Sequence, residues 1–403
     1  MKLKRIKFLK SLEITYIMAD TSFTNSILRN LNNILPKKNI ILFYSQYDYY
    51  DNPYYLYKKM LKMKTCEEFK CIWIVDTEDG FERVVRDGGV AVFRKDKKNM
   101  LKYITRAKYF LTSYTGGAWW KAKNQIGIFL DHGVFPLKTV GSYLNAEITK
   151  NRWKYFDYAV VTSPFTRILY SSIYQMNPSN IVTAGAPRDD IIFEYTKEES
   201  IKLLEKHLDC SLEPFEYKIF YLPTFRLFDP NFVKKSFIQL IKNEIFMKFL
   251  QENEAVLILK PHRGEEKYFK DLIEKRDIEN IKILSNDPLR RNNLTIYEFF
   301  KSIDILISDY SSVWVEYLLL NKPIVYYIPD IEKYRQKRGL IIEPYELWTP
   351  GDKVKDVPSL INALGDTIND PKKWEKERLW MRDIVFTYKD NKARERIIRY
   401  FWR

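Results

Sequence analysis

The sequence has few of the residues that build common nucleotide, metal and disulfide sites. Its 403 residues include 13 glycines, and neither the G-x-G-x-x-G pattern nor the G-x-x-x-x-G-K-[ST] phosphate loop occurs. Three cysteines are too few and too unevenly spaced for a disulfide framework or a four-ligand zinc site. We therefore expect reduced thiols in a cytosol, and a nucleotide site built without a glycine-rich loop.

Long hydrophobic runs are also missing. No stretch of about 18 consecutive apolar residues occurs, so we expect no membrane-spanning helix. Residues 1–18 interleave basic and apolar residues but lack the apolar core and cleavage site of a secretory signal. A helix there would have an apolar stripe and a basic face, which suits either a membrane surface or docking on the protein body.

Basic residues are abundant: 67 lysines and arginines against 52 acidic residues give a formal net charge of +15. Such an excess favours an anionic partner, which could be a nucleic acid, an acidic membrane face or a phosphorylated substrate. Nucleic-acid binding requires bases interleaved with aromatics along one face. Here bases gather at the ends of expected strands, so we expect no nucleic-acid partner.

Short, nearly continuous apolar runs alternate with segments of helical spacing, of which residues 51–63 and 232–253 are the clearest. Continuous runs are typical of strands that are buried on both faces of a parallel sheet. We expect strands at residues 39–45, 69–76, 107–113, 125–133, 156–163, 217–226, 255–262, 281–287, 304–309 and 323–329. The pattern predicts an α/β protein whose parallel sheets carry helices on both faces.

A charged stretch without a strand-like run, near residues 195–215, divides these strands into two sets. We therefore expect two Rossmann-like, doubly wound domains that face a central cleft. Residues 1–200 would form the first domain and residues 201–375 the second. The closing residues 376–403 are expected to form a helix that returns to the first domain.

Hydroxyl, basic and imidazole side chains follow the expected strands, where ligands of open α/β sheets bind. They are Ser45, His132, Lys138, Ser163, Arg188, Thr224, Arg226, Lys260, His262, Ser311 and Ser312. His132 and His262 occupy corresponding places in the two domains. An imidazole there could accept a proton from an attacking hydroxyl, or could simply hydrogen-bond a loop carbonyl. The arginine forks suit phosphate oxygens, although surface ion pairs would explain them equally well.

Residues 309–316, DYSSVWVE, place two adjacent serines between a buried strand and an expected helix. The hydroxyls of Ser311 and Ser312, with the free N–H groups of the first helical turn, would make an anion site. A neutral helix cap needs only one hydroxyl. Glu316 lies about one turn later on the same face, where it could accept hydrogen bonds from ribose hydroxyls.

Together these motifs resemble the CDP-glycerol glycerophosphotransferase family, the teichoic acid primases and polymerases of Gram-positive bacteria. The similar segments are YSQYDYYDNPYYLY, HGVFPLK, TSPF with AGAPRDD, LPTFR, LKPH, DILISDYSSVWVEYLLLNKPIVYYIPDIEKYRQKRG and YKDNKARERI. They span residues 44 to about 397, and residues 303–339 are the most specific part. The sequence departs from the family by having two residues, not one, between His-Gly and Pro-Leu-Lys, at the acceptor end of the site.

The resemblance implies a GT-B-like fold with a membrane-side acceptor domain and a CDP-donor domain. It implies transfer of glycerol phosphate from CDP-glycerol to a hydroxyl of a polyprenyl-diphosphate-linked saccharide or teichoic acid acceptor, with release of CMP, in wall teichoic acid or related polymer synthesis. His132 would be the base on the acceptor hydroxyl, and His262 would contact the phosphate under attack. The substrate-binding residues would be Gly133, Pro136, Leu137, Lys138, Arg188, Thr224, Arg226, Lys260, Ser311, Ser312 and Glu316.

The resemblance also implies a peripheral enzyme on the cytoplasmic face of the cell membrane, with an anionic membrane surface as a partner. No Asp-x-Asp or Asp-rich cluster occurs, so we expect transfer without a metal or cofactor. Ribitol phosphate remains an alternative to glycerol phosphate, as does a nucleotide-sugar glycosyltransferase of GT-B architecture. Primase or polymerase activity and the formation of a homo-oligomer stay open.

Overall fold

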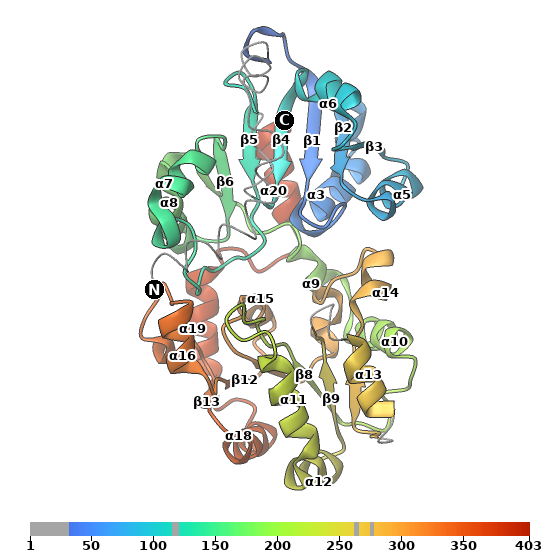
Figure 1. Ribbon diagram of the computed structural model, residues 1–403, viewed down its shortest axis with the longest axis vertical. Helices are drawn as coiled ribbons and strands as arrows, with labels where there is room; N and C mark the ends of the chain where they lie inside the picture. The colour runs from blue at the N-terminus through green and yellow to red at the C-terminus, as the bar shows by residue number, and fades with distance from the viewer. Residues whose placement is uncertain (1–31, 115–120, 262–265, 275–277) are drawn as a thin grey trace.

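The computed structural model describes residues 32–114, 121–261, 266–274 and 278–403, which form two α/β domains stacked end to end (Figure 1). Within these residues, the first sheet has seven strands in the order β3-β2-β1-β4-β5-β6-β7, and the second has six in the order β10-β9-β8-β11-β12-β13. Neighbouring strands pair in parallel throughout, as between β1 and β4 and between β8 and β11. Both sheets start in the middle and wind outward in both directions, so the expected doubly wound α/β architecture is confirmed.

The elements follow one another in a regular strand–helix alternation. The strands are β1 (Lys38–Tyr44), β2 (Lys70–Val75), β3 (Val90–Phe93), β4 (Ala107–Thr112), β5 (Ile126–Phe129), β6 (Tyr158–Val161), β7 (Ile181–Thr183), β8 (Tyr217–Tyr221), β9 (Ala255–Leu259), β10 (Ile281–Ile283), β11 (Ile305–Ser308), β12 (Ile324–Tyr327) and β13 (Asp352–Val354). The helices up to the second sheet are α3 (Asp51–Lys62), α4 (Thr65–Glu68), α5 (Glu78–Arg86), α6 (Lys97–Ile104), α7 (Ser142–Trp153), α8 (Pro164–Tyr174), η3 (Pro178–Asn180), α9 (Asp190–Glu194) and α10 (Lys197–Leu208). Those that follow are α11 (Phe232–Lys242), α12 (Glu244–Glu252), α13 (Glu266–Glu274), α14 (Asn286–Arg291), η5 (Tyr297–Ser302), α15 (Val313–Tyr317), η6 (Leu318–Leu320), α16 (Ile331–Lys337), α17 (Tyr345–Trp348), α18 (Val357–Asn369), α19 (Glu375–Val385) and α20 (Ala393–Trp402).

The continuous apolar runs are explained by burial on both faces of each sheet. In β1, Leu42 belongs to one hydrophobic cluster, whereas Ile41 and Phe43 belong to another. Alternate side chains of a strand point to opposite faces, so each face of the sheet has its own core. The same division in β8 places Phe220 and Tyr221 in different clusters.

Three strands were not expected from the sequence: β3, β7 and β13. Each lies at the edge of its sheet and is only partly buried. An edge strand needs less apolar surface, so it leaves a weaker pattern. The expected helix over residues 232–253 is also divided, because Asn243 is extended and its side chain accepts a hydrogen bond from the Phe246 N–H at 2.8 Å.

The closing helix α20 packs in the first domain, where Ile397 and Trp402 join the cluster of Phe43 and Trp73 (Figure 1). Helices α9 and α10 instead pack on the second domain, since Leu204 shares a cluster with the strands of the second sheet. The expected boundaries at residues 200 and 375 stay predictions.

Hydrogen bonds from two helices of the first domain hold the domains together on one side. The Tyr55 hydroxyl of α3 donates to Glu298 of η5 at 2.6 Å. The Arg83 guanidinium of α5 donates to the Asn293 side chain at 2.8 Å, and Arg83 is buried. The described part of the chain contains no helix that is long and apolar enough to cross a membrane, and residues 1–18 lie outside that part.

Candidate active site

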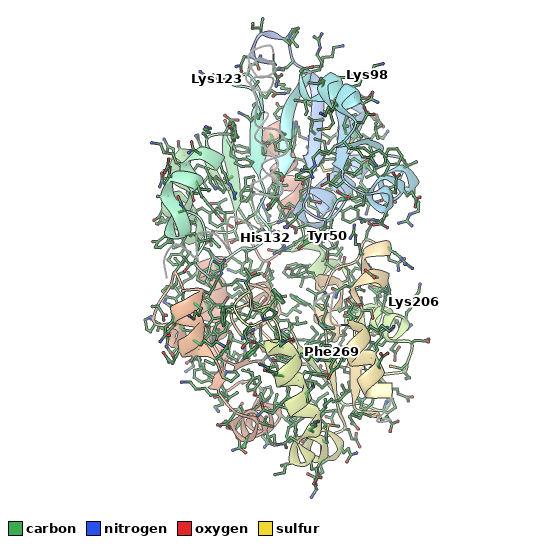
Figure 2. All side chains as sticks on the ribbon, in the orientation of Figure 1. Tyr50, Lys98, Lys123, His132, Lys206 and Phe269 are labelled. Carbon is green, nitrogen blue, oxygen red and sulfur yellow. The ribbon has the colours of Figure 1, made fainter. Side chains whose placement is uncertain are left out.

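The loops after the strands of both sheets meet between the domains, where Figure 2 places His132 and Tyr50. One close approach joins Gly133, after β5, to Ser312, after β11. A Cβ atom added to Gly133 would stand 3.4 Å from the Ser312 hydroxyl oxygen. The structure therefore brings the HGVFPLK motif and the serine pair together, as the strand-end positions suggested.

The serine pair opens the short helix α15 as predicted. Ser311 accepts a hydrogen bond from the Val313 N–H at 3.4 Å. Ser312 stands at the helix start, and within the described residues its side chain caps no N–H group. Its hydroxyl is thus available to a ligand beside Gly133.

Asp309, after β11, joins its own loop to the loop after β8, at the centre of the second sheet. Thr224 donates its backbone N–H to this carboxylate at 2.9 Å and its hydroxyl at 2.7 Å. Arg226 pairs with Asp309 and also with Asp330, at 3.1 Å, and is fully buried. The two predicted substrate-binding side chains Thr224 and Arg226 are therefore directed at Asp309, and they hold the loop that carries the serines.

The HGVFPLK loop of the first domain is bound to the KRG segment of the second. Lys138 and Leu340 form an antiparallel bridge, and the Thr139 N–H donates to the Gly339 carbonyl at 3.1 Å. Gly339 has a φ of +80°, and a Cβ there would lie 2.5 Å from the Thr139 hydroxyl oxygen. A glycine is required at this crossing because a side chain would be both strained and too close.

The side chains of this loop differ in where they point. Leu137 is fully buried with Val134 and Phe135 in the cluster that covers one face of the second sheet, and Pro136 is half-buried. The two residues between His-Gly and Pro-Leu-Lys are thus part of an interdomain core. Lys138 is half-buried, and burial together with the charge of Arg338 lowers its pKa to about 8.

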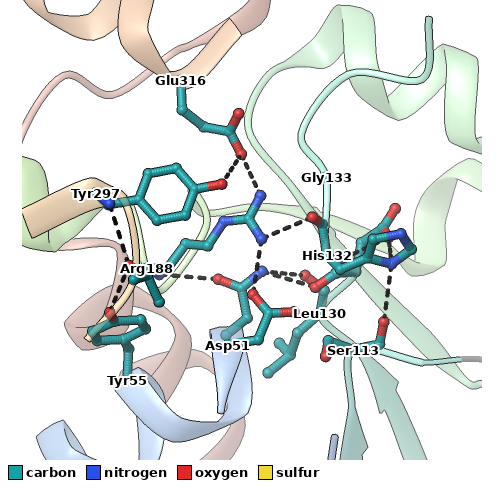
Figure 3. A network of polar contacts seen from close by, with 12 residues as sticks. Asp51, Tyr55, Ser113, Leu130, His132, Gly133, Arg188, Tyr297 and Glu316 are labelled. Atoms are coloured by element: carbon teal, nitrogen blue, oxygen red, sulfur yellow. Dashed lines mark hydrogen bonds and ion pairs between the residues drawn. The ribbon is translucent and has the colours of Figure 1, made fainter. Parts of the chain in front are cut away.

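Arg188 joins the two domains (Figure 3). Its guanidinium donates to the His132 carbonyl at 2.7 Å and to Asp51 at 2.8 Å, and it forms an ion pair with Glu316. The guanidinium carbon also lies 4.8 Å from the centre of the Tyr297 ring. Arg188 and Glu316, which were predicted to hold the donor, are therefore buried and paired with each other across the interface.

Asp51, Asn52 and Tyr297 also belong to this network but were not predicted from the sequence. The Asn52 side chain donates to the carbonyls of Leu130 and Asp131 at 3.0 and 2.8 Å, and accepts the Arg188 N–H at 2.9 Å. The signal for Asp51 and Asn52 was the polar pair before a proline that follows the expected strand 39–45. This local pattern does not reveal the contacts with Leu130, Asp131 and Arg188, because these residues lie far away in the chain.

His132 has an exposed ring and an anchored backbone. The side chain is 74% exposed, while the backbone N–H donates to Asp131 at 2.6 Å. Although most of this side chain is exposed, the protein packed around it still acts to lower the pKa of His132; the contact with Asp131 and the charge of Asp51 outweigh this effect and raise the pKa overall. His262 lies outside the described residues, and the nearby Lys260 donates to the Asn286 side chain.

Comparison with known proteins decides the family. Residues 27–403 match the model of the family described as CDP-Glycerol:Poly(glycerophosphate) glycerophosphotransferase. The chain belongs to this family. It is therefore a transferase, and the resemblance found in the sequence is confirmed.

Similar curated proteins and solved structures agree with this result. The teichoic acid poly(glycerol phosphate) polymerase of Bacillus spizizenii is 24% identical over 368 residues, which cover 85% of this chain and 88% of that protein. The teichoic acid glycerol-phosphate transferase of Staphylococcus aureus is 24% identical over 392 residues, covering 90% and 92%. A variant of the wall teichoic acid polymerase TagF superposes with a TM-score of 0.74 at 21% identity, over 97% of this chain and 96% of that one. The GT-B-like fold is confirmed.

Proposed function

We propose that this enzyme transfers glycerol phosphate from CDP-glycerol to a hydroxyl of a polyprenyl-diphosphate-linked acceptor, with release of CMP, in the synthesis of wall teichoic acid or a related cell-surface polymer. The observation that carries the proposal is the approach of Gly133 to Ser312. Gly133 directly follows His132, whose side chain is exposed, so this approach supports a site in which a proton acceptor and an anion-binding segment border one space between the domains.

The proposed reaction is an in-line displacement at the β-phosphorus of CDP-glycerol. A bond forms between the acceptor oxygen and this phosphorus, while the bond to the bridging oxygen breaks and CMP leaves with its electron pair. His132 takes the proton of the acceptor hydroxyl. Phosphoryl transfer needs mainly positioning and charge stabilisation from the protein, which two facing domains can supply.

Lys138 and Arg338 are suited to the diphosphate of the donor. Burial lowers the pKa of Arg338, as it does the pKa of Lys138, and the charge of Arg338 lowers the pKa of Lys138 further. Within the described residues neither side chain forms an ion pair with a carboxylate. A diphosphate bound between them and the serines would compensate both charges. Arg338 directly precedes Gly339, and no role was predicted for it from the sequence.

The low pKa of Lys138 predicts that donor binding depends on pH. In the free enzyme Lys138 loses its proton as the pH rises through about 8. We expect the affinity for CDP-glycerol to fall roughly tenfold between about pH 7 and about pH 9, the loss of one charge-assisted hydrogen bond. Calorimetric titration at several pH values measures this. Lys138→Arg, which stays charged, should flatten the dependence, and an equally steep fall in that variant would contradict it.

The transfer itself is tested by offering a polyprenyl-linked acceptor together with CDP-glycerol, CDP-ribitol or UDP-sugars. The expected result is release of CMP from CDP-glycerol and a mass gain of glycerol phosphate in the acceptor. Preference for CDP-ribitol would move the assignment to ribitol phosphate, and release of UDP would make the enzyme a glycosyltransferase. The product masses also separate a primase, which adds one or a few units, from a polymerase.

Metal independence stays a prediction that the same assay tests. Among the described residues no three histidine, cysteine or carboxylate side chains are grouped so that they could hold a metal ion. We expect the rate of CMP release to be unchanged by excess EDTA. A loss of activity that Mg²⁺ or Mn²⁺ restores would overturn this expectation.

Peripheral binding to an anionic membrane is the remaining part of the proposal. The net charge of +15 and the basic, apolar residues 1–18 support it. Each basic residue near an anionic surface contributes about 1 kcal/mol. Flotation with vesicles containing anionic lipid should therefore carry the full chain, and high salt should release it. A chain without residues 1–18 should float much less, and equal flotation of both chains would refute a role for this segment.

A further inference from the structure

Asp131, directly before His132, is held in an unusual position. Its backbone has a φ of +51°, in the left-handed region that side-chain-bearing residues seldom adopt. Its side chain is 10% exposed, and one carboxylate oxygen accepts the backbone N–H of His132 at 2.6 Å. This turn folds the carboxylate back beneath the imidazole of the next residue.

The surroundings of the His132 ring select one tautomer. The Nδ1 atom lies 3.2 Å from an Asp131 carboxylate oxygen and 3.4 Å from the Ser113 carbonyl oxygen, and the latter contact is drawn in Figure 3. Both neighbours are acceptors only. In the neutral ring Nδ1 must therefore carry the hydrogen, which leaves the lone pair on Nε2. Because the side chain is 74% exposed, Nε2 is free to meet a substrate hydroxyl.

Tyr170, from α8, fixes the carboxylate from the other side. Its hydroxyl donates to the second oxygen of Asp131 and also lies 2.7 Å from the Gly133 carbonyl oxygen. Burial, followed by the charge of Asp131, raises the pKa of Tyr170 well above its ordinary value, so it remains a donor. One phenol thus contacts the residues on both sides of His132.

We infer that Asp131, held by Tyr170, is a positioning residue that keeps the hydrogen of His132 on Nδ1 and stabilises the imidazolium formed during transfer. This inference rests on the proposed function. The acceptor proton goes to Nε2, the Nδ1 hydrogen stays on the ring, and Asp131 remains ionised throughout. The proton then passes from Nε2 to solvent.

The charges around His132 determine how a variant should behave. Asp131 and Asp51, at the start of α3, raise the pKa of His132, whereas the surrounding burial and Arg188, after β7, lower it. From α8, Tyr170 faces the carboxylate of Asp131 rather than the ring. Transfer needs neutral His132, so its rate should rise with pH through this pKa. Removal of the Asp131 charge should move that rise to lower pH.

Asp131→Asn tests this inference, because it keeps the size of the side chain but offers an amide that can donate to Nδ1 and favour the wrong tautomer. We expect kcat to fall about 10²-fold or more, with the KM for CDP-glycerol changed less than twofold. The acid limb of the kcat profile should shift to lower pH. Tyr170→Phe should lower kcat less and shift the acid limb in the same direction. Asp131→Glu, which keeps the carboxylate, should have a higher kcat than Asp131→Asn.

A spectroscopic measurement keeps the inference separate from the proposed function. The ¹⁵N shifts of the His132 ring, measured without substrate, report its tautomer and its pKa. We expect Nδ1–H in the wild type, and in Asp131→Asn a lower pKa with a larger share of the other tautomer. Glu147→Gln, which removes an exposed charge of α7, is the matched control.

The outcomes point to different conclusions. An unchanged pH profile and unchanged ring shifts in Asp131→Asn would overturn the inference, even if activity fell. Wild-type enzyme that transfers glycerol phosphate from no donor would instead refute the proposed function while the ring shifts still tested Asp131. If Asp131→Asn failed to fold, the ring shifts and pH profile of Tyr170→Phe would decide.

Discussion

Replacing His132 by alanine should lower the turnover of bound CDP-glycerol by roughly 10²–10⁴-fold, the usual contribution of a general base. Donor affinity should stay nearly the same. The imidazole is 74% exposed, whereas the interdomain network uses only the backbone of this residue. Arg188 bonds to the His132 carbonyl, and Asp131 accepts the His132 N–H; alanine keeps both groups. The substitution therefore removes the proton acceptor and its contacts with Asp131 and Ser113, and it leaves the interdomain hydrogen bonds of the backbone in place.

Single-turnover rates measured with labelled CDP-glycerol, together with calorimetric affinities for the donor, separate the two effects. His207→Ala is a matched control, since it removes an imidazole that donates to the Leu203 carbonyl, at 2.8 Å within α10, and packs against Phe299. It should leave both quantities unchanged. If His132→Ala abolished donor binding while bound donor still turned over at the normal rate, His132 would be a donor ligand and not the base.

The fold was predictable where burial is complete. All interior strands of both sheets coincide with expected runs, because a strand covered on both faces needs apolar residues at every position. The short strand β10 was also expected, although it lies at an edge. The edge strand β13, whose sequence is Asp-Lys-Val, carries two polar residues that are only partly buried. No local pattern distinguishes such a strand from a loop, so its place follows from pairing with β12.

The candidate site was predictable in its location but not in its pairings. His132 and Ser312 were predicted because both follow the carboxyl ends of strands, where ligands of open α/β sheets bind. The structure brings the loops that carry them together. Arg188 and Glu316 were assigned to the donor separately, yet they contact each other. They are 128 positions apart and come from different domains, and no spacing rule applies across such a distance. The left-handed backbone of Asp131 was equally invisible, since it depends on the surrounding contacts.

Replacing Arg188 by methionine should destabilise the protein by about 3–5 kcal/mol, the usual cost of removing one partner from a buried ion pair. Methionine keeps the bulk of the side chain but removes the cation that pairs with Glu316, which is fully buried and retains the hydrogen bond from the Tyr297 hydroxyl at 3.2 Å. Burial already raises the pKa of Glu316, and the charge of Arg188 opposes that effect. Loss of the guanidinium would leave this carboxylate without a counter-ion in the interface.

Urea unfolding of the single and double variants separates the ion pair from simple packing loss. Glu316→Gln in the Arg188→Met background should recover part of the stability, because a neutral amide tolerates burial better than an unpaired carboxylate. Arg335→Met is the matched control. Arg335 pairs with the exposed side chains of Glu332, Glu343 and Glu346 at 3.0–3.2 Å, so its replacement should cost only about 0–1 kcal/mol. Equal losses in Arg188→Met and Arg335→Met would show that the Arg188–Glu316 pair does not hold the domains together. A larger loss of stability in Arg188→Met, relieved by Glu316→Gln, would mean that two residues predicted to bind the donor also stabilise the domain interface. A ligand that draws Glu316 away from Arg188 would then weaken the interface in which it binds.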